Sequence, residues 1–190
     1  GQNGKGLVWM GERIRKKDNR GMTLVEIIIV LALMTVIAGM AGYGLSLVSN
    51  KPVQECTKKV EMALNRNRTN SMGKKEAWVE FFIENGRVTV LEHTLSGRTG
   101  AAPQETKSVI GDKDVNMRLT YSDGSVALLD GTHRRIAFAR DSGALVGNEV
   151  GVVCTKIEIF KGAYSSAGYK QTIVLETLTG KVRIVPASAP

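Results

Sequence analysis

An uncharged, largely apolar run from Ile27 to Val48 constrains this chain more than any other feature of its sequence. About 20 such residues in a helix span the hydrocarbon core of a bilayer, and the run is too long for the core of a secretory signal peptide. The small-residue cleavage site of a signal peptide is also poorly matched, because the run ends in GYGLSLVSNKP. We therefore expect a retained, membrane-spanning helix over residues 22–48.

Basic residues precede the apolar run. Residues 1–21 hold six basic and two acidic side chains, so half of the net charge of +8 lies in this leader. Lysine and arginine that flank a membrane helix stay on the cytoplasmic side. This predicts a single-pass chain with its N-terminus inside and its body outside the cytoplasm. Met10 begins a shorter basic leader of its own, so the start of the native chain is left with two alternatives.

One carboxylate, Glu26, lies at the edge of the apolar run, five residues after the glycine that ends the basic leader, Gly21. An isolated carboxylate is costly in hydrocarbon and is retained there only when another group pairs with it. Glu26 is therefore expected to have a cationic partner.

The order of basic leader, glycine, short hydrophobic start, glutamate and long apolar helix resembles the N-terminal signature of type IV pilins and pseudopilins. The resemblance implies that a prepilin peptidase cleaves between Gly21 and Met22 and methylates the new N-terminus at Met22. It further implies that Glu26 pairs with the N-terminal amine of an adjacent subunit during assembly. Such pairing makes two charges tolerable in lipid and sets the register between neighbouring helices.

The residues after the run predict an extracytoplasmic globular domain over 51–190, following a membrane or filament-core helix over 22–50. Residues 52–72 place apolar side chains three and four apart, which indicates a second helical half after a bend or break near 49–52. Asn85-Gly86 between two apolar segments, 77–83 and 87–91, predicts a tight hairpin.

Further short strands make the predicted fold class α+β, with the long N-terminal helix packed on antiparallel sheets. These strands are expected at 115–121, 126–129, 135–139, 152–160, 170–177 and 181–185, and a polar loop is expected at 96–108.

The C-terminal half has a finer resemblance. IAFARDSGALVG, CTKIEIF and YKQTIVLETLTGKVRIV resemble the strands and final hairpin of GspH/FimT-type minor pseudopilins and pilins. This implies a minor subunit of a type IV pilus or a type II secretion-like filament, with other pilins and an inner-membrane platform as partners. A major pilin of the filament shaft and a DNA-binding competence pilin are the alternatives. The type of machine, whether for secretion, motility or DNA uptake, is left open.

The two cysteines, Cys56 and Cys154, form no CxxC pair and no cluster with histidine, so we expect no zinc site and no other cofactor. Outside the cytoplasm these residues are candidates for a disulfide. The alternative is two separate buried thiols, since free cysteine often packs as a small hydrophobic residue.

No pattern indicates catalysis, so no catalytic residue is expected. Asp112, Asp114 and Asp123 have the setting of turn residues, and the Ser165-Ser166 pair has no histidine beside it.

Nucleic-acid binding requires several cations on one face. Lys181 and Arg183 are two residues apart in the last predicted strand, and Lys170 begins the strand before it. A second basic cluster, HRR, begins at His133. We weigh a DNA contact at Lys181 and Arg183 against an ordinary solvated sheet face.

Overall fold

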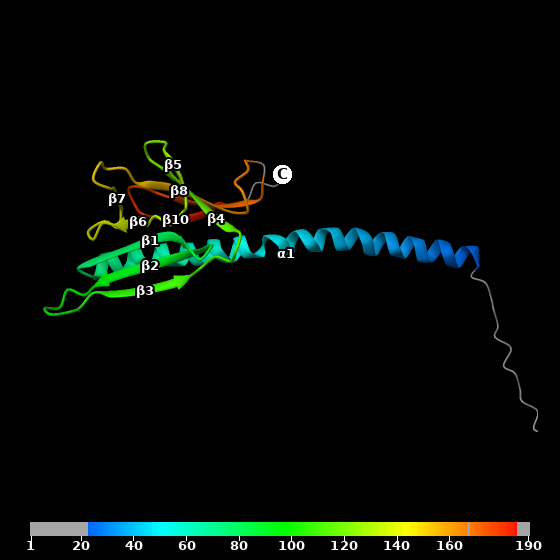
Figure 1. Cartoon of the computed structure of the whole chain (residues 1–190), viewed down its shortest axis with the longest axis horizontal. Coiled ribbons are helices and arrows are strands. Elements are labelled where there is room, and N and C mark those ends of the chain that lie inside the picture. The colour runs from blue at the N-terminus through cyan, green and yellow to red at the C-terminus, as the bar shows by residue number, and fades with distance from the viewer. Residues whose placement is uncertain (1–22, 167, 186–190) are drawn as a thin grey trace, which may run out of the picture. The chain divides into compact units, whose positions relative to one another are not determined.

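The computed structural model describes residues 23–166 and 168–185, with the side chains of residues 40–49 left outside the description. The chain divides into two units, Gly1–Gly44 and Leu45–Pro190. One helix, α1 (Leu24–Gly73), begins in the first unit, and every strand lies in the second (Figure 1). The strands are β1 (Glu76–Glu84), β2 (Arg87–Leu95), β3 (Gln104–Val109), β4 (Val115–Tyr121), β5 (Val126–Leu128), β6 (Arg134–Phe138), β7 (Leu145–Val146), β8 (Cys154–Lys161), β9 (Lys170–Leu175) and β10 (Val182–Val185).

Two five-stranded sheets make up the second unit together with the later part of α1. Sheet 1 has the order β3-β2-β1-β6-β7, and sheet 2 has the order β10-β9-β8-β4-β5. Every neighbouring pair in both sheets is antiparallel. The α+β class and its antiparallel sheets, predicted from the run of short strands, are thus confirmed for the described residues.

The predicted hairpin at Asn85-Gly86 is also confirmed. Asn85 has φ 51° and Gly86 has φ 71°, and Glu84 is paired directly with Arg87 across the turn. Positive φ at both central residues is the geometry of the tight hairpin turn whose twist matches that of the strands. The local sequence therefore determines the register of β1 and β2 in sheet 1.

Of the bend or break predicted in the helix near residues 49–52, the break is wrong, because α1 continues through Pro52. A proline inside a helix removes one main-chain donor and costs about 3 kcal/mol. The residues that follow offset this cost: Val53, Cys56, Val60 and Leu64 are fully buried. Burial of a large aliphatic side chain contributes about 1.5–3 kcal/mol, so tertiary packing outweighs the local effect of the proline.

Two strands were not expected. The predicted loop 96–108 ends in β3, and Leu145–Val146 form the short strand β7. All six residues of β3 are exposed, so this edge strand shows no alternation of apolar and polar residues. It is held by main-chain pairing with β2, from Thr89↔Val109 to Thr94↔Gln104. A strand that exists through such pairing leaves little trace in its own sequence.

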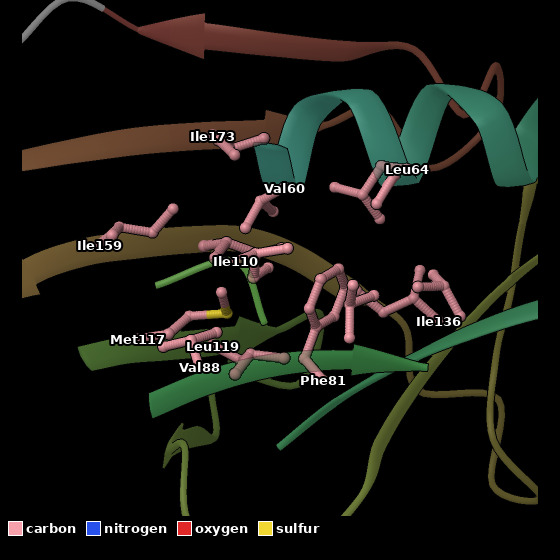
Figure 2. Close-up of a cluster of buried hydrophobic side chains, with 14 of the residues drawn as sticks. Val60, Leu64, Phe81, Val88, Ile110, Met117, Leu119, Ile136, Ile159 and Ile173 are labelled. Carbon is pink, nitrogen blue, oxygen red and sulfur yellow. The ribbon is translucent and has the colours of Figure 1, made fainter. Parts of the chain in front are cut away.

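The core lies between α1 and the inner faces of the two sheets (Figure 2). Side chains from α1, from both sheets and from the segment after β3 meet in it, including Val60, Leu64, Phe81, Val88, Ile110, Met117, Leu119, Ile136, Ile159 and Ile173. The helix stripe predicted within residues 52–72 is the part of α1 that faces this core.

The turn of the final hairpin contacts the rest of the domain through a hydrogen bond and a close backbone approach. Arg68 of α1 donates from Nε to the Thr179 carbonyl at 3.0 Å. Gly180 has φ 61°, and a Cβ at this position would lie 1.9 Å from the Gly143 carbonyl oxygen. Only glycine fits there, which explains the Thr-Gly sequence that precedes β10.

Candidate assembly site and charged surfaces

The first turn of α1 carries Glu26 and is capped by Thr23. The Ile27 N–H donates to the Thr23 carbonyl at 3.1 Å, and the Glu26 N–H donates to Thr23 Oγ1 at 3.3 Å. Thr23 is therefore the N-cap residue, and Glu26 is the third residue of the helix, the spacing of a capping box. A carboxylate in this turn is stabilised by the helix dipole. Sequence reasoning missed this role of Thr23, although the signal was present in TLVE.

The described side chains from Leu24 to Gly39 are all exposed. Large apolar side chains of this segment keep between 40% (Val30) and 74% (Leu24) of their surface accessible. A helix that is apolar around its whole circumference is normally covered by lipid or by other protein. The exposed segment is therefore a candidate assembly surface, and Glu26 is its only carboxylate among the described residues.

Among the described residues, no helix combines the length and the apolar character needed to cross a membrane. The membrane-spanning part of the fold predicted for residues 22–48 is thus not confirmed. Gly21 and Met22, the predicted cleavage and methylation positions, lie outside the described residues.

The N-terminal sequence matches a known sequence motif. A family model for the prokaryotic N-terminal methylation motif matches residues 16–42. The chain carries a type IV pilin-like N-terminus. The matched segment contains Gly21, Met22 and Glu26 together with the capped start of α1. Searches of curated proteins and of solved structures found no match to the chain. The GspH/FimT subtype inferred from the last strands is therefore not confirmed.

Cys56 and Cys154 are free thiols, both buried in the core cluster. Burial raises the pKa of each thiol to about 12, because the core does not solvate a thiolate. Both groups are therefore protonated at neutral pH and pack as small apolar residues. Of the two alternatives that the sequence left open, the disulfide is not observed, and the structure shows separate buried thiols.

The second basic cluster noted at residues 133–135 is paired with carboxylates in the structure. His133 Nδ1 lies 2.8 Å from Glu80 Oε2, and Arg135 Nε donates to Glu80 Oε1 at 2.9 Å. Arg134 lies 3.8 Å from a carboxylate oxygen of Asp130. Two carboxylates thus balance this cluster, and the pairing with Glu80, more than 50 residues away in the chain, is one that sequence spacing could not reveal.

Lys181 and Arg183 are both exposed and alternate with the buried Val182. They therefore share the outer face of sheet 2, as the alternation predicted. Arg183 Nη2 lies 3.4 Å from Glu176 Oε1, so part of its charge is balanced. The structure brings them to one face with Lys170, which lies on the neighbouring strand β9.

Asp123 has the turn role expected of it. Its Oδ1 accepts hydrogen bonds from the Ser125 N–H at 2.9 Å and from the Ser125 hydroxyl at 2.6 Å. These bonds lower the pKa of the Asp123 carboxyl. The carboxylate therefore stabilises the β4–β5 turn.

Proposed function

We propose that this chain is a subunit of a type IV pilin-like filament, made as a precursor and cleaved between Gly21 and Met22. The observation that carries the proposal is the N-terminal methylation motif at residues 16–42, which includes the exposed apolar start of α1. A prepilin peptidase removes the leader and methylates the amine of Met22. The chain is then held in the cytoplasmic membrane by residues 22–48 until assembly.

Glu26 is the residue that we assign to assembly. Glu26 lies in the first turn of α1, and we propose that it pairs there with the amine that cleavage would create on Met22 of a neighbouring subunit. Two unpaired charges are each expensive in a low-dielectric filament core, whereas the pair is tolerated. Removal of one partner is therefore expected to cost far more than removal of an exposed glutamate elsewhere.

We further propose a minor pilin or pseudopilin of the GspH/FimT type, supported by the resemblance of the last strands. A major pilin is the alternative, and the abundance of the chain in sheared surface filaments separates the two. A DNA-binding competence pilin is a third candidate, which salt-dependent binding of duplex DNA through Lys181 and Arg183 would support. No catalytic step is part of this proposal.

The deciding experiment is the intact mass and N-terminal sequence of the full chain extracted from membranes of a host that contains a prepilin peptidase. A chain that begins at N-methylated Met22 supports the proposal. Gly21→Val should block cleavage, because a bulky side chain then occupies the cleavage position. Gly11→Val, a matched change within the leader, should be processed normally. If the wild-type chain keeps its leader beside a peptidase that processes a known substrate, the proposal fails.

A further inference from the structure

We propose that the outer face of sheet 2 docks the globular unit on a bilayer that contains anionic phospholipid. The inference rests on the proposed function, since the N-terminal segment would hold the domain at a membrane. It concerns a different surface, however, and sheet 2 lies wholly within the second unit.

The strand registers define this outer face. Arg118 on β4 lies opposite Glu158 on β8, and Glu158 lies opposite Thr172 on β9. The side chains that alternate with them along the strands, such as Ile157 and Ile173, are buried in the core. The face opposite the core therefore runs across all five strands of sheet 2.

Cations predominate on this outer face. Among the described residues, the registers and the alternation place on it five cations and two carboxylates, namely Arg118, Lys156, Lys170, Lys181 and Arg183 with Glu158 and Glu176. The face thus has an excess of three positive charges. Positive charge gathered on one face is complementary to the negative surface potential of an anionic leaflet.

Glu158 organises the centre of the cationic group. Its side chain is 5% exposed and lies 2.8 Å from Arg118 Nε, 3.5 Å from Lys170 Nζ and 3.8 Å from Lys156 Nζ. One carboxylate thus holds three cations in place without neutralising them. The charge of the face is arranged before any partner arrives, which lowers the entropy lost on binding.

Exposed apolar side chains border the same face. Val126 and Leu128 on the edge strand β5 are 51% and 52% exposed, and they lie opposite Thr120 and Arg118. Val185 on the other edge strand, β10, is 41% exposed. Apolar side chains beside lysine and arginine suit a membrane interface, where they enter the headgroup layer while the cations contact phosphates.

The aromatic residues of this face favour lipid over single-stranded nucleic acid. The Tyr164 ring has the Arg118 guanidinium 3.8 Å from its centroid and meets the Phe160 ring edge-on at 5.2 Å. Proteins that bind single strands stack bases on free aromatic rings. These two rings are instead engaged with each other and with a cation, and exposed valine and leucine have no role in phosphate contacts.

The test uses the full chain reconstituted into vesicles of neutral phosphatidylcholine or of phosphatidylcholine with phosphatidylglycerol. An amine-reactive reagent followed by mass spectrometry measures the modification rates of Lys156 and Lys181, with the exposed Lys113 as the internal reference. We expect lower rates for Lys156 and Lys181 in anionic than in neutral vesicles, an effect that high salt removes, and no change at Lys113.

A charge-reversed variant supplies the second measurement. Lys181→Glu with Arg183→Glu should weaken binding of the face to anionic vesicles by more than about 25-fold, since the loss of each basic residue costs about fivefold and the two new carboxylates add repulsion. Lys58→Glu with Lys75→Glu makes the same change of net charge at exposed positions elsewhere, keeps Lys113 as the reference, and should leave the protection of Lys156 unchanged. Circular dichroism of both variants verifies that they fold.

The outcomes separate this inference from the proposed function. Recovery of the chain with both vesicle types at high salt, but with no lipid-dependent protection, overturns the docking surface and leaves the membrane anchor intact. Recovery with anionic vesicles alone, at low salt and not at high salt, supports the docking surface and contradicts the anchor, and recovery with neither vesicle type at low salt contradicts both. Protection of Lys156 and Lys181 by an oligonucleotide, with none from anionic lipid, would assign the face to nucleic acid instead.

Discussion

The two halves of α1 differ in where their apolar side chains go. In the first half, from Leu24 to Gly39, every described side chain is exposed, and the large apolar ones lie all around the helix. In the second half, Val53, Val60 and Leu64 are fully buried, whereas Lys58 and Lys59 between them are exposed. A single apolar stripe can be covered by the sheets of the same chain, but an apolar circumference needs a surface from outside it. One helix thus serves folding in its second half and, under our proposal, assembly in its first.

The largest effect is expected from Glu26→Ala. The variant should be processed but absent from filaments, because the Met22 amine of a neighbouring subunit would lose its partner. Glu26→Gln should fail in the same way, since it keeps the size of the side chain and removes the charge. The measurement is the amount of mature subunit in sheared filaments relative to the membrane pool.

Glu55→Ala is the matched control for Glu26, because Glu55 is an exposed glutamate in the second half of α1. It should enter filaments at the wild-type level. Normal incorporation of both Glu26 variants would remove Glu26 from assembly and leave it as a residue of the capped first turn.

The next largest effect distinguishes folding in the second half from exposure in the first. Leu64→Ala should lower the free energy of unfolding by about 2–5 kcal/mol, because it opens a cavity in the core. Leu31→Ala, at a position 57% exposed, should change it by less than about 0.5 kcal/mol. Denaturant unfolding of the detergent-solubilised chain, followed by tryptophan fluorescence, gives both values.

The two leucines should exchange roles in a filament assay. Leu31→Ala should reduce incorporation, whereas Leu64→Ala should affect it only through loss of folded chain. Equal destabilisation by the two substitutions would mean that the first half of α1 also stabilises the fold of the second unit. The proposed difference between the two halves of α1 would then be wrong.

The smallest effect concerns pH and only the sheet domain. Burial alone would raise the pKa of Glu158, but the hydrogen bond from Arg118 and the charges of Lys156 and Lys170 outweigh it, so the pKa is lowered. A carboxyl whose pKa is lower in the folded state stabilises the fold above its unfolded pKa, near 4.5, and this contribution is lost as the pH falls. Carboxyl groups of this kind titrate between about pH 3 and pH 7. The temperature of thermal unfolding should therefore fall as the pH is lowered through this range.

Glu158→Gln should flatten part of that acid dependence. The rest should persist, because hydrogen bonds in turns also lower the pKa values of Asp123 and Asp130. Glu61→Gln, on the second half of α1, is the control and should keep the wild-type profile. An unchanged profile for Glu158→Gln would mean that the three surrounding cations do not stabilise the fold through this carboxylate.

Local signals allowed much of the fold to be predicted. Asn85-Gly86 determines a hairpin because those two residues accept positive φ, and the alternation along β4, β8 and β9 follows from one buried face. The break at Pro52 was wrong because burial outweighed a local cost, and β3 was missed because an exposed edge strand has no alternation. Both errors arise where pairing or packing with distant residues decides the outcome.

The sequence by itself determined the N-terminal motif around Gly21, Met22 and Glu26, because this signal consists of residues in fixed order along one stretch of chain. It also determined the helical stripe and the main hairpins, which depend on neighbours within a few residues. Only the tertiary structure decided that Glu80 balances His133 and Arg135, that Cys56 and Cys154 stay separate, and that one outer face collects the cations of β4, β8, β9 and the final hairpin. Those outcomes depend on which strands become neighbours, and strand order is set by the packing of the whole core rather than by any local segment.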